Sequence, residues 1–287
     1  MSRLHAWSDL HVDYPDNFKL IAGLSDSDYR DDTLLIAGDV SSDAEKVLSC
    51  LRELKRKFRD VAFVPGNHDL WVLNQDPFNS LEKLHELHAR CQAEDIRVNP
   101  FNAEISGRTW QIIPLLSWYL KPEEGDGSLF LEKPGEDPSL EMWADNYRIK
   151  WPEMPDDATP AEHLLSLNRP PGSSDEPRRV VTFSHFLPRV ELVFQEWEKF
   201  LTTRHGSGND AVSEFNFTRV AGCRQLDELL REWGSTVHVY GHQHRNRDRV
   251  ITGVRYLSHC LGYPPEWNQR NTQPPRKRPL EVFPERP

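Results

Sequence analysis

The sequence of 287 residues predicts a layered α/β fold with a substantially parallel central sheet. Short apolar runs rich in β-branched residues alternate with segments in which apolar residues recur every three or four positions. Strands that alternate with helices in this way are typical of parallel sheets. The predicted strands are Leu4–Ser8, Thr33–Ala37, Val61–Val64, Trp110–Leu115, Val180–Phe183, Thr236–Tyr240 and Val250–Leu257.

The first predicted helix lies between the second and third strands. Ser41 or Ser42 can cap its start, and Asp43 is expected to be an acid at its N-terminal end rather than a metal ligand. Basic residues follow at its other end, where they suit the helix dipole. Its apolar face comprises Val47, Leu48, Leu51, Leu54 and Phe58.

Two further helices show the same periodicity. One begins near Asn79, which has capping-box spacing to Glu82. The other spans residues 223–233. Their apolar faces comprise Leu81, Leu84, Leu87 and Cys91 in one, and Leu226, Leu229, Leu230 and Trp233 in the other.

Two segments differ from this body. Residues 121–178 contain nine prolines and 14 acidic against 6 basic residues, and residues 263–287 form a Pro-rich tail that is expected to be loosely attached. We therefore predict one domain over residues 1–262 that carries an acidic insertion at 121–178. Within the insertion Trp143, Tyr147 and Trp151 recur every four residues, which indicates a helix that begins near Pro138. This aromatic stripe packs on the domain surface or, alternatively, forms a lid beside the active site.

The net charge of −10 argues against a general nucleic-acid-binding protein, because neutralising phosphates requires clustered Lys and Arg. No apolar run approaches the ~18 residues of a membrane helix, and the N-terminus has no signal-peptide pattern. The four cysteines lack metal or disulfide spacing, so they are interpreted as small buried thiols. A cytoplasmic protein is expected, and the oligomeric state stays open.

Five short blocks of metal-binding residue types each follow directly after a predicted strand. In open α/β sheets, ligands bind beyond the carboxyl ends of the strands, so the five blocks are expected to meet at one edge. Taken singly, each residue could equally be a capping or solvated loop residue. The blocks are Asp9-Leu10-His11, Gly38-Asp39, Gly66-Asn67-His68-Asp69, Ser184-His185 and Gly241-His242-Gln243-His244.

The residue types in these blocks favour two metal ions. Residues two apart in an extended chain point to the same side, so Asp9 and His11 can bind one ion together, as can His242 and His244. Imidazole and oxygen donors without a thiolate suit Mn, Fe, Zn, Co or Ni. Seven candidate ligands exceed the needs of one tetrahedral ion, whereas two divalent or trivalent ions that share a carboxylate fit the number.

The blocks D-x-H, G-D, G-N-H-D, a lone H after a strand, and G-H-x-H, in this order, resemble the calcineurin-like metallophosphoesterase superfamily. The matched blocks span residues 9–69 and 185–244. The resemblance implies an αββα-type fold, in which central sheets are flanked by helices and the site lies at the carboxyl ends of the strands. It implies one ion held by Asp9, His11 and His244, a second held by Asn67, His185 and His242, and Asp39 as the bridge.

The resemblance also implies roles for two further residues. His68 would be the catalytic histidine that is not a ligand and protonates the departing alkoxide. Asp69 would hold the imidazole of His68 in the required tautomer. The alternative is an ordinary loop histidine bonded to Asp69. Arg189, His259 and Trp71 are weaker candidates for substrate contacts, since a solvated or packing role explains each of them as well.

Departures from the family pattern narrow the function. The second block lacks the Arg, and the third block the terminal Glu, of the Ser/Thr protein phosphatases, so a stand-alone hydrolase of small phosphate esters is expected. A phosphomonoesterase that acts on a small metabolite or nucleotide is the first hypothesis. A phosphodiesterase for a small diester such as a cyclic nucleotide is the second, and a non-catalytic protein-binding scaffold is the third. If the acidic insertion approaches the metals, it should repel nucleic acid and admit small esters.

Overall fold

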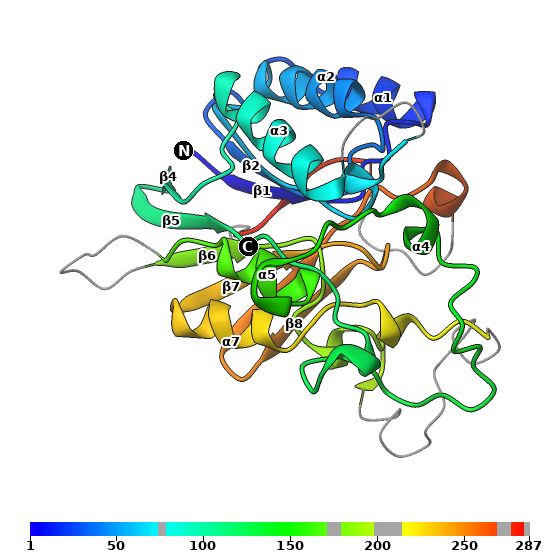
Figure 1. Cartoon of the computed structure of the whole chain (residues 1–287). Helices are drawn as coiled ribbons and strands as arrows, with labels where there is room; N and C mark the ends of the chain where they lie inside the picture. Colours follow the sequence, from blue (N-terminus) through cyan, green and yellow to red (C-terminus); the bar gives the residue numbers. More distant parts are fainter. Residues whose placement is uncertain (74–78, 171–178, 198–213, 269–276, 284–287) are drawn as a thin grey trace.

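Two β-sheets form the centre of the molecule. The computed structural model describes residues 1–73, 79–170, 179–197, 214–268 and 277–283, and within them ten strands are present (Figure 1). The first sheet has the order β10-β1-β2-β3 and the second β4-β5-β6-β7-β9-β8. The first comprises β1 (Leu4–Trp7), β2 (Thr33–Ala37), β3 (Asp60–Val64) and β10 (Leu280–Glu281). The second comprises β4 (Phe101–Ile105), β5 (Arg108–Pro114), β6 (Val180–Phe183), β7 (Ser235–Tyr240), β8 (Arg247–Ile251) and β9 (Val254–Ser258).

Most strand pairs that carry the site are parallel. β1, β2 and β3 run parallel to one another, as do β5, β6, β7 and β9, whereas β10, β4 and β8 are antiparallel to their neighbours. Helices lie outside both sheets, except for α4 (Asp145–Arg148), which lies beside the ends of the strands (Figure 1). They are α1 (Pro15–Ala22), α2 (Ala44–Lys55), α3 (Ser80–Ala93), α4 (Asp145–Arg148), α5 (Pro160–Ser166) and α7 (Gln225–Glu232).

Three apolar clusters show that the fold has four layers. One cluster joins α1, α2 and the outer face of the first sheet, and includes Val47, Leu51 and Ile36. A second lies between the two sheets. The third joins the outer face of the second sheet to α5 and α7. The αββα-type arrangement predicted from the sequence is therefore confirmed.

One predicted strand is wrong. The run Val250–Leu257 is not a single strand but a hairpin, in which β8 pairs antiparallel with β9. Thr252 and Gly253 separate the two strands with φ of 48° and 83°. Two successive residues with positive φ are the signature of a tight hairpin turn, and Gly253 was the only sequence signal for it.

The proline-rich tail is attached more firmly than its composition predicts. β10 pairs antiparallel with β1, with His5 opposite Glu281. Val282 is fully buried between the sheets, and the ring of Phe283 stacks on Trp110 at 4.5 Å. The expectation of a loosely attached tail is therefore wrong for residues 277–283, because two residues of backbone pairing, the buried side chain of Val282 and the partly buried ring of Phe283 anchor it.

The insertion also differs from the prediction. The expected helix from Pro138 to Trp151 is reduced to the four residues of α4, and Leu140 has a left-handed backbone with φ of 53° that interrupts it. The aromatic stripe is split. Trp151 packs edge-on against Trp118 at 5.0 Å and Trp143 stacks on Phe215 at 5.3 Å, whereas Tyr147 is 65% exposed.

Other sequence predictions agree with the structure. All four cysteines are buried free thiols. Among the described residues, the helices are all too short or too polar to cross a membrane. Asn79 caps α3 by accepting the backbone N–H groups of Leu81 and Glu82. For α2 the cap is Asp43 rather than Ser41 or Ser42, because its side chain accepts from Glu45 N at 2.9 Å and Lys46 N at 3.2 Å.

The cap at Asp43 leads to a prediction about stability. Asp43→Ala leaves two N–H groups of α2 without their acceptor, which should lower the free energy of unfolding by about 1 kcal/mol in urea titrations. Asp43→Asn keeps an acceptor oxygen and should lose much less. Metal content should be unchanged in both variants. Loss of metal from Asp43→Ala would show that Asp43 is a ligand, contrary to its assignment as a cap.

Candidate metal centre

All five blocks lie at the carboxyl ends of their strands, where the two sheets meet. Asp9 follows β1, Asp39 follows β2 and Asn67 follows β3, whereas His185 follows β6 and His242 follows β7. Backbone hydrogen bonds join loops within each sheet, such as Asp9 N to Gly38 O at 2.9 Å and Gly241 N to His185 O at 3.0 Å. The two sheets are joined at the site itself, since the carboxylate of Asp9 accepts His242 N at 3.0 Å.

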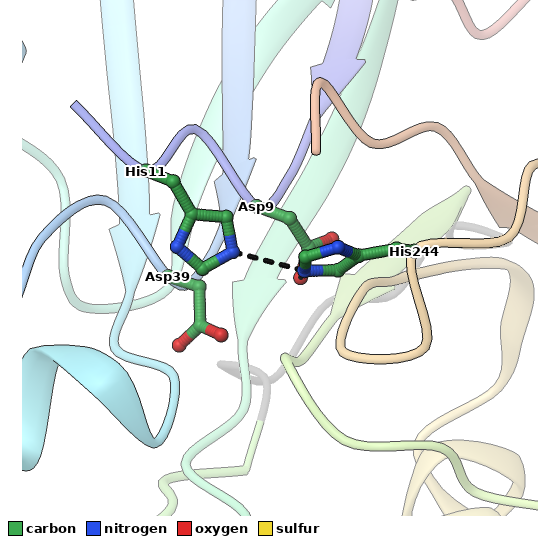
Figure 2. A group of neighbouring side chains, drawn as sticks. All are labelled: Asp9, His11, Asp39 and His244. Atoms are coloured by element: carbon green, nitrogen blue, oxygen red, sulfur yellow. Dashed lines mark hydrogen bonds and ion pairs between the residues drawn. The ribbon is translucent and has the colours of Figure 1, made fainter. Parts of the chain in front are cut away.

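The first ligand group consists of four side chains that point toward one another (Figure 2). Each offers one ligand atom, and these atoms all lie within 4.8 Å of one another. Nε2 of His11 and Nε2 of His244 face each other at 2.9 Å. Ligand atoms about 2 Å from a central ion have this spacing. The group comprises Asp9, His11, Asp39 and His244.

The second ligand group shares Asp39 with the first. Asp39, His185 and His242 also place their ligand atoms within 4.8 Å of one another. Oδ1 of Asn67 lies 3.1 Å from Nε2 of His185, which adds an amide oxygen to this group. A carboxylate that belongs to two adjacent groups is the expected bridge between two ions. The structure thus brings all seven predicted ligands together.

The protonation of the cluster fits a cation site. Burial tends to raise the pKa of Asp39, but the imidazoles of His185 and His68 outweigh it and hold the pKa well below its usual value. Burial tends to lower the pKa of His185, but Asp39 raises it to about 9. Burial itself raises the pKa of Asp9. Two buried carboxylates side by side thus depend on nearby positive charge, which a pair of metal ions supplies.

Hydrogen bonds to backbone carbonyls orient two of the histidines. Nδ1 of His185 donates to the carbonyl of Ala37 at 2.9 Å, and Nε2 of His242 donates to the carbonyl of Val220 at 2.9 Å. A carbonyl only accepts, so these nitrogens carry protons, and the other nitrogen of each ring is the one that can bind a metal once it holds no proton. Burial also lowers the pKa of His242 well below its usual value. The neutral imidazole that results is the form that binds metal.

Five of the seven ligand residues have a left-handed backbone. For residues other than glycine this conformation costs about 1 kcal/mol and is tolerated best by Asp and Asn. The chain accepts it because each ligand lies in a sharp turn directly after a buried strand. The φ values are 54° for Asp9, 42° for His11, 57° for Asp39, 74° for His242 and 55° for His244.

Glycines let these turns approach one another closely. A Cβ at Gly38, where φ is 80°, would lie 2.4 Å from Nδ1 of His185. A Cβ at Gly66 would lie 2.1 Å from Oδ1 of Asp39. Any side chain at either position would push a ligand out of place, which explains why the G-D and G-N-H-D blocks begin with glycine.

Asp69 does not contact the imidazole of His68 as the sequence predicts. Its Oδ2 accepts the backbone N–H of Asp39 and of Gly66, both at 2.8 Å. Its Oδ1 accepts from Val40 at 2.9 Å and Ser41 at 3.0 Å. Asp69 therefore joins the loop after β3 to the loop after β2, and it positions Asp39 rather than His68.

His68 lies at the rim of the cluster. Its Nε2 is 3.9 Å from Oδ2 of Asp39, and its side chain is 19% exposed, whereas Asp39 is 2% exposed. Its backbone N–H donates to Oδ1 of Asp39 at 2.9 Å. The ring of Trp71 stacks on the imidazole, with centroids 3.7 Å apart and planes at 28°. Trp71, a predicted substrate contact, thus packs against the predicted catalytic histidine.

Two other predicted substrate contacts are engaged elsewhere. The guanidinium of Arg189 pairs with Asp227 at 2.8 Å and Glu191 at 2.5 Å, which places it in a surface network on α7. His259 is buried, and its Nε2 donates to the carbonyl of Arg278 in the tail at 2.8 Å. The structure therefore does not place Arg189 or His259 as contacts for a phosphate.

Three site residues were missed by the sequence analysis, and all lie in the two segments without family motifs. Asp145, in the insertion, accepts Asn67 Nδ2 at 2.9 Å. Glu266, in the tail, accepts from Nδ1 of His244 at 2.9 Å. The ring of Tyr263 lies 4.5 Å from that of His11. The only sequence signal was the Gly-Tyr-Pro run at 262–264, because one acid among many in the insertion carries no distinguishing pattern.

Comparison with known proteins agrees with this geometry. A model of the calcineurin-like phosphoesterase family matches residues 3–246. The acyl-carrier-protein phosphodiesterase PptH of Mycobacterium tuberculosis is 25% identical over 276 residues, which cover 93% of this chain and 80% of the relative. The crystal structure of phosphopantetheinyl hydrolase (PptH) from the same organism covers 100% of this chain and 98% of its own, with a TM-score of 0.72 and 23% identity.

Asp39 contributes to both ligand groups, so its neutral variant should lose both ions. We expect Asp39→Asn to retain far less than two metal equivalents per chain in elemental analysis after dialysis. The metal-free variant should be less thermally stable than metal-free wild type, because the buried imidazolium of His185 loses its anionic partner. Asp60→Asn, at the opposite end of β3, is the control. Full metal retention by Asp39→Asn would contradict the assignment of a bridge.

Replacement of Glu266 should weaken the binding of only one of the two metal ions. Glu266→Ala removes the acceptor that orients His244, and loss of such a partner typically weakens metal binding about 10- to 100-fold. In calorimetric metal titrations we expect the site that includes His244 to weaken and the other to be unchanged. Glu228→Ala, an exposed acid on α7, should bind both ions normally. Equal weakening of both sites would be inconsistent with a local role.

Proposed function

Because this chain belongs to the calcineurin-like phosphoesterase family and is a metal-dependent phosphoester hydrolase, we propose that its substrate is a phosphodiester. The observation that carries the proposal is the similarity to an acyl-carrier-protein phosphodiesterase, which extends over 93% of the chain. The sequence alone favours a phosphomonoester. The diester, which is the second hypothesis from the sequence, fits the similarity to a phosphodiesterase better.

The position of Arg189 supports a diester. A monoester carries two negative charges at neutral pH and would favour an additional cation beside the metals, whereas a diester carries one. Arg189 is the cation that the sequence offers for this role, but Asp227 and Glu191 neutralise it on α7. The acidic insertion also reaches the ligands through Asp145, which further disfavours a more highly charged substrate.

We extend the substrate to a carrier protein that bears phosphopantetheine. The relative in Mycobacterium tuberculosis is an acyl-carrier-protein phosphodiesterase, and the solved structure is a phosphopantetheinyl hydrolase. The bond cleaved would be the P–O bond that joins the phosphate of the phosphopantetheinyl arm to the carrier protein. The alternative substrates are a small diester and a small monoester, and a substrate screen distinguishes both of them from the carrier protein. A non-catalytic scaffold does not fit, because all seven ligands and His68 lie together.

The side chains of this site would act as follows. The two ligand groups hold the metal pair, which when bound supplies positive charge for the phosphoryl oxygens and lowers the pKa of water. His68, at the exposed rim, donates a proton from its imidazole to the departing oxygen. Burial lowers the pKa of His68, which makes the imidazolium a stronger acid. Asp39 faces it at 3.9 Å and favours the protonated form.

The cellular setting stays a proposal. Four free buried thiols suit a reducing compartment, and we propose that the chain acts in the cytoplasm.

A substrate screen tests the function. Purified chain loaded with Mn²⁺ should hydrolyse bis(4-nitrophenyl) phosphate faster than 4-nitrophenyl phosphate, and should release phosphopantetheine from a holo carrier protein in mass spectrometry. His68→Asn should lower the release of phosphopantetheine from the holo carrier protein, whose departing oxygen is a poor leaving group, by about 10²- to 10⁴-fold while metal content is retained. His85→Asn, which changes an exposed histidine of α3, is the control. No hydrolysis of either ester by metal-loaded wild type would refute the enzymatic proposal, and a preference for the monoester would refute the diester.

A further inference from the structure

The insertion is fastened to the loop that carries Asn67 and His68. Val72 N donates to Arg148 O at 2.7 Å, and Ser80 N donates to Lys150 O at 2.9 Å. Lys150 N in turn donates to Oγ of Ser80 at 3.0 Å. These bonds hold α4 against the segment that follows β3, and they bring one carboxylate of the insertion into the metal centre.

That carboxylate belongs to Asp145, which is only 3% exposed. Its Oδ1 accepts two side-chain donors, Asn67 Nδ2 at 2.9 Å and Trp71 Nε1 at 2.6 Å. Among the described residues, its Oδ2 is buried without a hydrogen-bond partner. A buried carboxylate is costly, so a fold that keeps one here gains something from the two bonds it makes.

The first bond determines which end of the Asn67 amide faces the metals. The two ends of an amide have nearly the same shape, but only the oxygen can bind a cation. Because Nδ2 donates to Asp145, Oδ1 must point the other way, toward Nε2 of His185 at 3.1 Å. Without Asp145, the amide of Asn67 can turn its nitrogen toward the ion.

The second bond determines the plane of the His68 imidazole. The indole of Trp71 is held by its N–H bond to Asp145, and its ring stacks on the imidazole at 3.7 Å. The side chain of His68 is 19% exposed, and its ring is restrained by the stacking on Trp71 and by an edge contact with the ring of His11 at 4.8 Å. A general acid must point its N–H at the departing oxygen, and loss of the restraint would lower the fraction of correctly oriented imidazole.

We propose that Asp145 is a positioning residue that orients the metal ligand Asn67 directly and the acid His68 through Trp71. The inference rests on the proposed function, since it assumes that His68 protonates the leaving group. It assigns the acidic insertion a part in the reaction rather than a covering role.

Four variants separate positioning from a general effect on folding. Asp145→Ala removes both bonds, whereas Asp145→Asn keeps an acceptor oxygen for both donors and should rescue. Trp71→Leu removes the stacking on His68 but leaves the bond to Asn67. Asp137→Ala changes another acid of the same insertion, whose carboxylate accepts from Ser139 alone among the described residues, and serves as the control.

Two readouts are expected to change. In elemental analysis after dialysis, Asp145→Ala should lose about one of two metal equivalents, and Trp71→Leu should keep both. Turnover should be measured on methyl 4-nitrophenyl phosphate and methyl phenyl phosphate. Because the poorer phenolate leaving group depends more on protonation, Trp71→Leu should lower kcat about 10- to 100-fold on the phenyl ester and clearly less on the nitrophenyl ester. Asp145→Ala, which also loses a metal ion, should lower kcat on both esters.

The outcomes distinguish this proposal from the function itself. Wild-type metal content in Asp145→Ala, or equal losses of kcat on both esters in Trp71→Leu, would overturn it even though the wild-type enzyme is active. Failure of Asp145→Asn to restore either readout would also overturn it. If wild type hydrolyses neither ester, the proposed function fails and the role for His68 with it, while the metal content of Asp145→Ala against Asp137→Ala still decides the role for Asn67.

Discussion

The burial of two neighbouring carboxylates, Asp9 and Asp39, is the constraint on which this structure depends. Neither is stable as an anion at this depth without compensating charge, and the surrounding side chains are arranged to provide it. Imidazoles from both sheets face the carboxylates, and carbonyl groups hold two of these imidazoles by their outer nitrogens. Asp69 fixes the loop that presents Asp39, although it is itself a buried acid. The cluster is therefore electrostatically incomplete as protein alone, and two cations complete it.

The four-layer fold explains how so many polar groups converge. The apolar cluster between the sheets holds the carboxyl ends of β1, β2 and β3 next to those of β6 and β7, so that five short loops open onto the same region. The acidic insertion and the proline-rich tail then add an outer set of contacts. Asp145 bonds a ligand of the second group and Glu266 bonds a ligand of the first. Each ion site thus has an orienting carboxylate from a segment outside the family blocks.

The features that the sequence predicts are those encoded locally. The ligands stand directly after buried strands, so a reading of strands and of His, Asp and Asn locates all seven, and the helical periodicities of α2, α3 and α7 are equally local. What escapes prediction depends on contacts between distant segments. Arg189 offers a phosphate-binding cation until Asp227 is brought beside it by the fold. Asp145 cannot be distinguished among the acids of the insertion, because only its contact with Asn67 sets it apart. Asp69 follows the family motif, but the amides that it bonds are determined by the adjacent loop.

The left-handed backbone at five ligand positions has a consequence for how such a protein can change. At Asp9 and His11, replacement by glycine would relieve backbone strain in the apoprotein and, at Asp9, would also remove a carboxylate whose pKa is raised by burial. The same replacement removes a ligand. Selection for thermal stability alone would therefore favour replacements at the metal-binding residues. Variants obtained in that way would tend to be stable but inactive. At these positions the backbone conformation that lowers the stability of the apoprotein is the one that places the metal-binding side chains.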